Sequence, residues 1–298
     1  MDATISLILT ASDSPEAVEG FLKALGGGGL SWSEEGREII VVSAFAMTAP
    51  PIGITWIQAA EGSVVPRLRR VGLDASRGSV VVFAEDSVRP CEGWLEAYRR
   101  AFLDPAVKSA TGPSVYGSSK AAWDRAVFLF EYGDFALGIA PIVRPSGHNF
   151  AAVREVLANS GDELHEHELS LDGFRCADKA AVTHVRRYSP EEAVRDRFRF
   201  GRDYGARRWK GRFRPLGLVA IPGVAIVQGM RMFRLFTHRS LREFRPSWPA
   251  LAVLVWAWSV GEGVGWLTAR ACGKRRGTPK GPASERPATG VRSCSWPL

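Results

Sequence analysis

The sequence predicts an α/β fold with a doubly wound, mostly parallel sheet and helices on both of its faces. Short apolar runs alternate with segments of helical periodicity, and this alternation repeats through about the first hundred residues. Such alternation specifies parallel strands that are joined by crossover helices. With 298 residues, the chain has room for one large α/β domain and an appendage.

The first strand and helix are predicted at residues 5–25. The apolar run 5–10 ends in a polar loop, and Pro15 stands where a first helical residue does not need its N–H group. In the helix that follows, apolar residues recur at i, i+3, i+4 and i+7: Val18, Phe21, Leu22 and Leu25. The glycines at 26–29 end the helix.

The same pattern predicts the next elements. Three further strands are expected at residues 38–42, 54–57 and 79–83. Helices are expected at 64–75, after Pro90 and around 123–130. Residues 141–147 break the chain, and another helix is expected after them.

Charge divides the chain into two parts. Residues 1–194 hold 18 basic and 26 acidic residues, whereas residues 195–298 hold 21 basic and 5 acidic residues. A mildly acidic domain suits small-molecule chemistry, and a basic, apolar region suits a phosphate-bearing surface. Apolar runs between the basic clusters favour a lipid surface over nucleic acid.

The cysteines and the N-terminus indicate a reducing compartment. The four cysteines show neither CxxC spacing nor a dense framework, so no zinc site or disulfide scaffold is expected. The first apolar run is short and follows Asp2 rather than basic residues, which is unlike a signal peptide. We therefore expect the N-terminal domain to stay in the cytoplasm.

The C-terminal region predicts helices that associate with a membrane. A basic helix is expected at 190–209, and residues 216–229 are apolar but short and contain Pro222. Residues 249–271 are apolar with one charge, Glu262, so they could cross a bilayer or lie in its interface. The predicted domains are 1–210 for the α/β domain, 211–272 for the membrane-associated helices and 273–298 for a disordered basic tail.

Two carboxylates follow the buried strand at 79–83. Glu85 and Asp86 are thereby delivered to the carboxyl edge of the sheet, where open α/β sheets bind ligands. Carboxylates at such a place can hold a divalent cation, which neutralises a diphosphate and stabilises it as a leaving group. The residues alone fit a solvated loop without a ligand equally well, so a cation site and a solvated loop both remain open.

Several segments resemble the family 2 glycosyltransferases in their order and spacing. The chain's Leu-Arg-Arg-Val-Gly-Leu and Phe-Ala-Glu-Asp-Ser are similar to the family's Ala-Arg-Asn-x-Gly-Leu segment and its strand that ends in an aspartate pair or DxD motif. The similar segments of this chain are 5–25, 39–44, 68–73, 83–87, 147–157 and 165–184. Residues 258–266 also resemble the Gly-Glu-containing C-terminal membrane segment of exopolysaccharide-type members.

The resemblance implies a GT-A-like fold and an inverting transfer from a nucleotide-sugar donor. A carboxylate would remove the proton of the acceptor hydroxyl as that oxygen attacks the anomeric carbon, and Glu166 is the implied base. The implied substrate-binding residues are Ala11, Ser43, Arg69, Glu85, Asp86, Gly147, His148 and Asn149. The implied ligands of Mg²⁺ or Mn²⁺ are Glu85, Asp86 and His184.

Three positions depart from the family pattern. Ser43 stands in place of an aspartate that binds the base or ribose, and Ser87 replaces the last acid of the DxD-like motif. A serine hydroxyl lacks the charge that binds Mg²⁺ or Mn²⁺ tightly, so the metal site is expected to be weak, altered or absent. His165 and Glu166 replace Glu-Asp, which keeps the charge of the base but lengthens its side chain.

The sequence is therefore interpreted as an enzyme at the cytoplasmic face of the cell membrane that extends a lipid-linked or polysaccharide acceptor. An alternative is a catalytically degenerate relative that serves as a binding or scaffold protein in envelope polysaccharide assembly. A third interpretation takes the arginine-rich residues 195–245 as a nucleic-acid surface. Flanking apolar stretches and the lack of a recognised nucleic-acid motif argue against it, so no nucleic-acid partner is expected.

Overall fold

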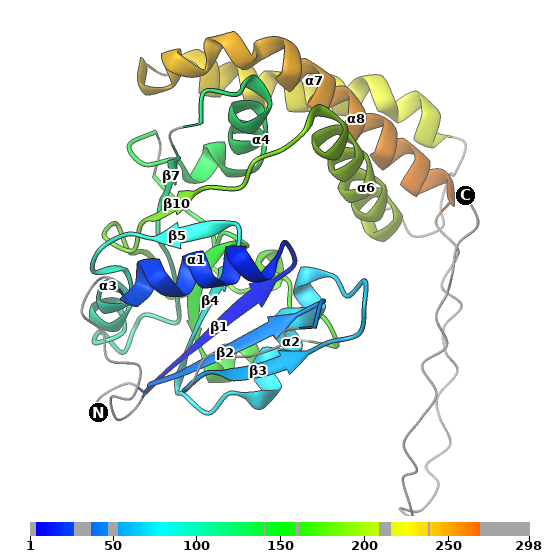
Figure 1. Ribbon diagram of the computed structural model, residues 1–298. Coiled ribbons are helices and arrows are strands. Elements are labelled where there is room, and N and C mark those ends of the chain that lie inside the picture. The colour runs from blue at the N-terminus through cyan, green and yellow to red at the C-terminus, as the bar shows by residue number, and fades with distance from the viewer. Residues whose placement is uncertain are drawn as a thin grey trace, which may run out of the picture.

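The chain folds into an α/β domain with a layer of long helices above it (Figure 1). The computed structural model describes residues 4–26, 37–46, 53–117, 119–139, 141–158, 161–208, 216–237 and 239–268. The α/β domain holds most of the first 180 residues, and the helical layer is built largely from the C-terminal part of the chain (Figure 1).

The main sheet has seven strands in the order β3-β2-β1-β4-β8-β6-β9. Its strands are β1 (Ile5–Ala11), β2 (Arg37–Ser43), β3 (Thr55–Gln58), β4 (Val80–Glu85), β6 (Ser109–Thr111), β8 (Asn149–Val153) and β9 (Phe174–Cys176). Strands β1 to β4 pair in parallel, β6 pairs with β9 in parallel, and β8 runs antiparallel to β4 and β6. The predicted α/β class and mostly parallel sheet are confirmed.

Helices cover both faces of this sheet. Alternate residues of a strand point to opposite faces, and in β1 Leu7 and Leu9 join one apolar cluster while Ile8 joins another. The first cluster packs against α1 (Pro15–Gly26) and α3 (Trp94–Ala101). The second packs against α2 (Val65–Ala75) and α5 (Arg154–Leu157). Because β1 is buried on both faces along its whole length, its apolar residues do not alternate with exposed polar ones.

The α1 helix has the apolar stripe that its sequence predicts. Its buried residues are Val18, Phe21, Leu22 and Leu25. The Ser14 hydroxyl caps the helix by accepting a hydrogen bond from the Ala17 N–H group at 3.2 Å. The loop between β1 and α1 is therefore fixed at the carboxyl end of β1.

The helix predicted after residues 141–147 is present but short, and a strand that was not predicted precedes it. Residues 149–153 form β8, and only the four residues after them are helical. The segment is extended because it fills the gap between β4 and β6, where its backbone groups pair on both sides. Its small alanines, Ala151 and Ala152, are fully buried between the helices on the two faces of the sheet. Tertiary pairing therefore overrides the local helical preference of these residues.

A small second sheet lies between the α/β domain and the helical layer (Figure 1). It consists of β5 (Val88–Pro90), β10 (Val182–His184) and β7 (Ser114–Tyr116). Strand β10 pairs antiparallel with β5 and parallel with β7. Since β5 directly follows the end of β4, this sheet joins the carboxyl edge of the main sheet to the helices above it.

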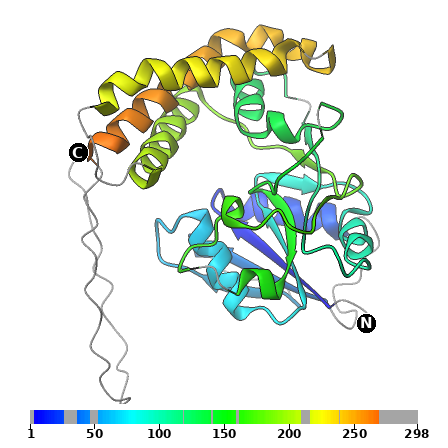
Figure 2. The same ribbon diagram turned by 180° about the vertical axis from the view of Figure 1, so that it is seen from behind.

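The helical layer has its own apolar core. Its elements are α4 (Ala122–Tyr132), η1 (Gly133–Phe135), α6 (Pro190–Arg208), α7 (Leu216–Thr237), η3 (Arg239–Ser247) and α8 (Trp248–Thr268). The core joins α4, α7, η3 and α8, and includes Phe128, Met232, Phe244 and Leu254. Figure 2 shows this layer from behind, with α7 and α8 running along the top of the molecule.

Glycines allow α6 and α8 to cross at close range. A Cβ atom on Gly201 would lie 2.3 Å from the backbone oxygen of Trp258, and one on Gly265 would lie 1.9 Å from that of Arg202. Gly205 and Gly261 are equally close to the facing backbone. Since any side chain at these positions would collide with backbone atoms, the two backbones come within a distance that only glycine allows.

One helical segment of the described residues meets the length and composition of a membrane span. It covers Arg242–Thr268 and has a mean hydropathy of 1.4, with 56% of its apolar window buried inside the protein. Core helices of soluble proteins meet the same criteria, so the segment is weak evidence for a span. The apolar run at 216–229 belongs to α7, which continues through Pro222 as far as Thr237.

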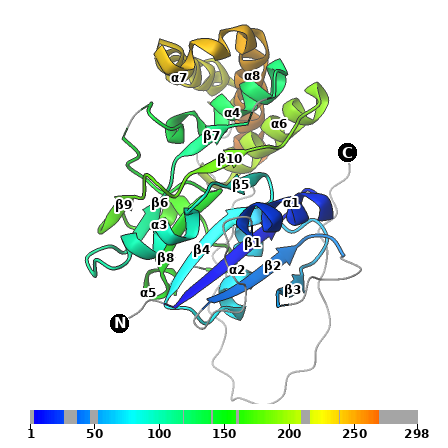
Figure 3. The same cartoon turned by 60° about the vertical axis from the view of Figure 1, so that its left-hand side comes forward.

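The predicted domain boundaries at 210 and 272 stay predictions, and the tail at 273–298 lies outside the described residues. The basic helix predicted at 190–209 is present as α6. It packs across α8, so residues 190–208 join the helical layer rather than the sheet (Figure 3). Cys91 and Cys176 are free thiols, and the other two cysteines are outside the described residues.

Candidate functional site

The carboxyl ends of the three central parallel strands lie side by side. Thr10 of β1 pairs with Glu85 of β4, and Ala11 pairs with Ser43 of β2. This register brings the β1–α1 loop next to the loop that begins with Asp86. The sequence-predicted residues Ala11, Ser43, Glu85 and Asp86 therefore meet at one edge of the sheet.

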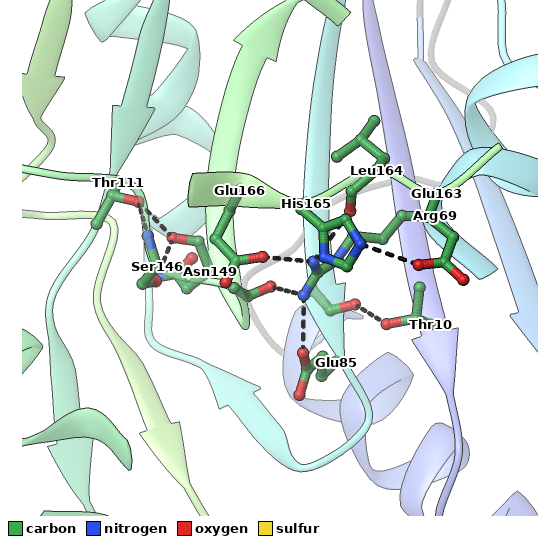
Figure 4. Close-up of polar contacts among 12 residues, drawn as sticks. Thr10, Arg69, Glu85, Thr111, Ser146, Asn149, Glu163, Leu164, His165 and Glu166 are labelled. Atoms are coloured by element: carbon green, nitrogen blue, oxygen red, sulfur yellow. Dashed lines mark hydrogen bonds and ion pairs between the residues drawn. The ribbon is translucent and has the colours of Figure 1, made fainter. Parts of the chain in front are cut away.

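Arg69 of α2 lies at the centre of this edge and is almost fully buried. Its Nη2 atom donates to Glu85 Oε1 at 3.0 Å and to the Gly147 carbonyl, and its Nη1 atom donates to Glu166 Oε2 at 2.8 Å. Nη1 also lies 3.4 Å from the Leu164 carbonyl oxygen. Figure 4 shows the guanidinium between the two carboxylates.

The guanidinium group of Arg69 also packs over an aromatic ring. Its Cζ atom lies 5.6 Å from the centroid of the Phe150 ring, which stacks on Phe83 with a centroid distance of 4.7 Å. Arginine suits this position because its planar fork can donate to several acceptors at once and stack on an aromatic face. Strands β4 and β8 thus form a rigid base for the cation.

Glu166 combines a fixed position with access to solvent. It lies in the short η2 turn (Glu166–Glu168), and its side chain is 27% exposed although it is ion-paired with Arg69. The preceding residue, His165, is held by a hydrogen bond between Nε2 and Glu163 Oε2 at 2.9 Å. A partly exposed carboxylate with a fixed orientation can serve as a general base.

Glu85 is less exposed than Glu166, and its environment contains opposing influences. Burial raises the pKa of Glu85, while the adjacent Arg69 guanidinium lowers it. Its side chain is 21% exposed. The carboxylate is therefore within reach of a ligand at the sheet edge, but Arg69 already holds one of its oxygens.

Asp86 is buried and holds the β1–α1 loop. Its Oδ2 atom accepts hydrogen bonds from the backbone N–H groups of Ser12 at 3.0 Å and Asp13 at 2.8 Å. Burial, reinforced by the nearby Asp13 carboxylate, raises the pKa of Asp86 to about 7. The Oδ1 atom has no hydrogen-bond partner in the described part of the chain.

The residues predicted to bind a metal do not assemble into a metal site. Among the described residues, no group of three or more histidine, cysteine, aspartate or glutamate side chains could hold a metal ion. Glu85 is paired with Arg69, and His184 is enclosed by the aromatic rings of Tyr132 and Tyr188. Burial lowers the pKa of His184 to about 3. In this arrangement these described residues do not form a site for Mg²⁺ or Mn²⁺.

The predicted substrate residues at 147–149 have three different environments. Gly147 lies in the site, where a Cβ atom would be 3.0 Å from Arg69 Nη2 and 3.1 Å from Glu166 Oε1. His148 is buried, and its Nε2 atom lies 2.5 Å from Ser114 Oγ. Burial lowers the pKa of His148 well below its usual value.

Asn149 is fully buried, and both the oxygen and the nitrogen of its side-chain amide are hydrogen-bonded. Its Oδ1 atom accepts from Trp94 Nε1 at 2.9 Å and from the Tyr98 hydroxyl at 2.8 Å, and its Nδ2 atom donates to the Ala180 carbonyl at 2.9 Å. These bonds join β8 to α3 and to the loop before β10. Asn149 is therefore a structural support of the site in this arrangement, and its predicted contact with substrate stays a prediction.

The two remaining predicted residues are buried at the sheet edge. Ala11 ends β1, and its carbonyl accepts from the Ala44 N–H group at 3.1 Å. The Ser43 hydroxyl donates to the Phe45 carbonyl at 2.6 Å. Ser43 thus stabilises the turn after β2, and its predicted role at the nucleotide is not tested by this arrangement.

Sequence reasoning missed an ion-paired group beside Asp86. Asp13 Oδ1 lies 2.9 Å from Arg186 Nη1, and Arg186 Nη2 lies 3.7 Å from Asp196 Oδ2 of α6. The position of Asp13 directly after the first strand, where ligand-binding loops of such sheets lie, could have indicated it. Nothing in the sequence around Arg186 indicates this ion pair, because its contact with Asp13 depends on the tertiary fold.

The fold and the site together define an α/β protein with an arginine–carboxylate centre at the carboxyl edge of its sheet. No protein-family model matches the chain, and no curated protein sequence matches it. Similar solved structures include a mannosyltransferase from Pyrobaculum calidifontis in complex with GDP-Man and Mn²⁺. It has 14% sequence identity and a TM-score of 0.49, over 88% of this chain and 87% of that one.

Two further solved structures are similar over about two thirds of this chain. Glucosyl-3-phosphoglycerate synthase from Mycobacterium tuberculosis, in complex with phosphoglyceric acid, has 18% identity and a TM-score of 0.45 over 67% of this chain and 78% of that one. Residues 1–349 of TarS from S. aureus have 13% identity and a TM-score of 0.43 over 66% of this chain and 64% of that one.

Proposed function

We propose that the chain is a glycosyltransferase that transfers a sugar from a nucleotide-sugar donor to a hydroxyl of a lipid-linked or glycan acceptor, with inversion. The observation that carries this proposal is the bridge that Arg69 forms between Glu85 and Glu166 at the carboxyl edge of the sheet. Ligands of open α/β sheets bind at this edge. The Arg69 guanidinium provides positive charge for a diphosphate at this edge, and the partly exposed Glu166 carboxylate beside it can serve as a base.

The proposed reaction is a single displacement at the anomeric carbon. Glu166 takes the proton of the acceptor hydroxyl as its oxygen forms the new bond to that carbon. The bond from the anomeric carbon to the diphosphate breaks at the same time, and its electron pair leaves with the nucleoside diphosphate. Attack on the face opposite to the leaving group inverts the configuration.

Arg69 would act on both sides of this displacement. Its ion pair holds Glu166 Oε2 at 2.8 Å, which fixes the orientation of the proposed base. The same guanidinium provides positive charge where negative charge grows on the leaving diphosphate. The predicted use of Mg²⁺ or Mn²⁺ stays a prediction that the experiment below tests directly.

The proposed location is the cytoplasmic face of the cell membrane, with a role in cell-envelope polysaccharide synthesis. The basic and apolar composition of residues 195–298 supports membrane association. The alternative of a catalytically degenerate binding or scaffold protein rests on the substituted acids Ser43 and Ser87. We favour an enzyme because Glu166 keeps a positioned and partly exposed carboxylate.

The test is release of nucleoside diphosphate from a panel of UDP-, GDP- and TDP-sugars by the detergent-solubilised chain. Each donor is incubated with Mn²⁺, with Mg²⁺ and with EDTA, since slow donor hydrolysis needs no known acceptor. Glu166→Gln should lower release by about 10²–10⁴-fold, which is the usual contribution of a general base. Glu168→Gln is the matched control, because Glu168 lies in the same η2 turn and is exposed.

Release that Glu166→Gln abolishes and Glu168→Gln leaves unchanged would support the proposal and identify the donor. Equal release by both variants would exclude Glu166 as the base. Absence of release from every donor by a folded protein would favour the non-catalytic alternative. Once an acceptor is found, the anomeric configuration of the product, measured by NMR, tests inversion.

A further inference from the structure

An open apolar groove lies between α6 and α8, on the helical layer. Its volume is about 520 Å³, and its polar rim consists of Glu191 and Arg195. Its apolar lining residues are Val194, Phe198, Val253, Trp256, Ala257 and Val260. We refer to this feature as the α6–α8 groove.

The α8 wall of the groove exposes large apolar side chains. Val253, Trp256 and Val260 are 44%, 54% and 37% exposed, and their spacing of three and four residues places them on one face of the helix. The α7 helix also exposes Ile226 and Phe233 by more than 60%. Exposed apolar surface of this kind is typical of a site that contacts a protein or a membrane.

Arginines border the groove along α6. Arg195, Arg199 and Arg202 are all exposed and follow one another at i, i+4 and i+7, so they form a stripe on one side of the helix. Arg195 is itself part of the groove rim. We refer to these three residues as the arginine stripe.

The groove faces away from the candidate active site. On α6, Asp196 faces Arg186, and Arg207 Nη1 lies 3.8 Å from Glu163 Oε2, so these residues mark the side towards the sheet. At about 100° per residue, Phe198 lies nearly opposite to Asp196 on the helix. A ligand in the groove would therefore not enter the site of sugar transfer, which argues against an acceptor chain as the occupant.

We propose that the α6–α8 groove binds acyl chains of anionic phospholipids at a bilayer surface, while the arginine stripe binds their phosphates. The charge complementarity is direct, because guanidinium groups match phosphate oxygens in bidentate hydrogen bonds. Continuity with the exposed apolar face of α8 favours a bilayer over a free lipid, since that face would otherwise remain in water. The inference rests on the membrane attachment in the proposed function and is independent of the sugar transfer.

The test is flotation of the full chain with vesicles of phosphatidylcholine alone or mixed with phosphatidylglycerol. The wild type should bind the mixed vesicles more tightly. The double variant Arg195→Glu, Arg199→Glu should weaken that binding by about tenfold or more, because each basic residue near an anionic bilayer strengthens the binding of the protein to it. Its matched control is Arg100→Glu, which changes an exposed arginine on α3 of the α/β domain.

A second variant tests the apolar part of the surface. Trp256→Ser combined with Val260→Ser should weaken binding to both kinds of vesicle, whereas Leu103→Ser should not, since Leu103 is 60% exposed outside the helical layer. Quenching of tryptophan fluorescence by brominated acyl chains should fall in Trp256→Phe. Circular dichroism melting shows whether each variant is folded.

The proposal is overturned if the wild type does not bind the mixed vesicles, or if the groove and stripe variants bind as well as the wild type. Either outcome would show that the groove and the arginine stripe do not bind a bilayer. Donor hydrolysis measured without vesicles separates the two proposals. Loss of vesicle binding with unchanged hydrolysis affects only the membrane surface, and loss of hydrolysis with unchanged vesicle binding affects only the catalytic proposal.

Discussion

The guanidinium of Arg69 donates to Glu166 Oε2 at 2.8 Å and to Glu85 Oε1 at 3.0 Å. One buried cation thus connects a helix, the end of a central strand and the turn that holds the candidate base. Removing one partner of such a buried pair leaves uncompensated charge.

Arg69→Gln should reduce donor hydrolysis, because it removes the guanidinium that holds Glu166 Oε2 at 2.8 Å and Glu85 Oε1 at 3.0 Å. Arg69→Lys keeps the charge but loses the planar fork, so it should retain only part of the activity. The measurement is kcat and KM of each variant. An unchanged kcat in Arg69→Gln would show that Arg69 does not position Glu166.

Gly147→Ala should lower kcat with little change in melting temperature. The added methyl group would lie 3.0 Å from Arg69 Nη2 and 3.1 Å from Glu166 Oε1, so one of these side chains must move. Displacements on the order of 1 Å can cost about 10²-fold in rate. Gly161→Ala is the control, because a Cβ atom there meets no atom within 4 Å. Equal activity of both variants would contradict the proposed geometry.

Asp86→Asn should change the pH dependence of stability. The folded-state pKa of Asp86 is about 7 and its unfolded value is about 3.8, so the folded chain binds this proton more tightly. The stabilisation is fully present below pH 4 and is lost as the pH rises through about 7. A difference of about three pKa units corresponds to roughly 4 kcal/mol.

The asparagine variant stays neutral and keeps an oxygen that can accept from Ser12 and Asp13. Its free energy of unfolding, relative to that of the wild type, should therefore increase from pH 5 to pH 8 in urea titrations. A difference that does not vary with pH would show that Asp86 is already ionised throughout this range in the folded chain.

Asn149→Ala should destabilise the α/β domain by about 3 kcal/mol. It leaves the buried Trp94 indole, the Tyr98 hydroxyl and the Ala180 carbonyl without their side-chain partner, and each unsatisfied buried group costs about 1–3 kcal/mol. Trp94→Phe removes only one of these bonds and should cost less. Chemical denaturation measures both. A cost below that of Trp94→Phe would mean that Asn149 is not the central support.

Much of the sheet could be predicted from the sequence, because the pattern of apolar residues along the chain indicates where its first strands lie. The strand at 5–10 and the helix with Val18, Phe21 and Leu25 follow from hydrophobic periodicity, and both are present as β1 and α1. Strand β8 was not predictable in the same way. Its short, alanine-rich segment becomes a strand only because β4 and β6 pair with it on both sides.

Part of the candidate site could also be predicted from the sequence. Glu85 and Asp86 were placed at the sheet edge because they follow a buried strand, and the structure places them there. The different states of the two carboxylates were not predictable. Glu85 pairs with Arg69 of helix α2. Asp86 is buried and accepts from the backbone N–H group of Ser12, which is 74 residues away in the sequence.

By itself, the sequence determined the first four strands, the helices α1 and α2, the position of Glu85 and Asp86 at the carboxyl edge of the sheet, and the division into an acidic and a basic part. These properties depend on neighbours along the chain. Only the tertiary structure decided that Arg69 joins Glu85 to Glu166, that Asn149 supports α3, and that α6 crosses α8 on glycines. The reason is physical: an ion pair, a buried amide and a close helix crossing all depend on the three-dimensional positions of distant segments, which local propensity does not specify.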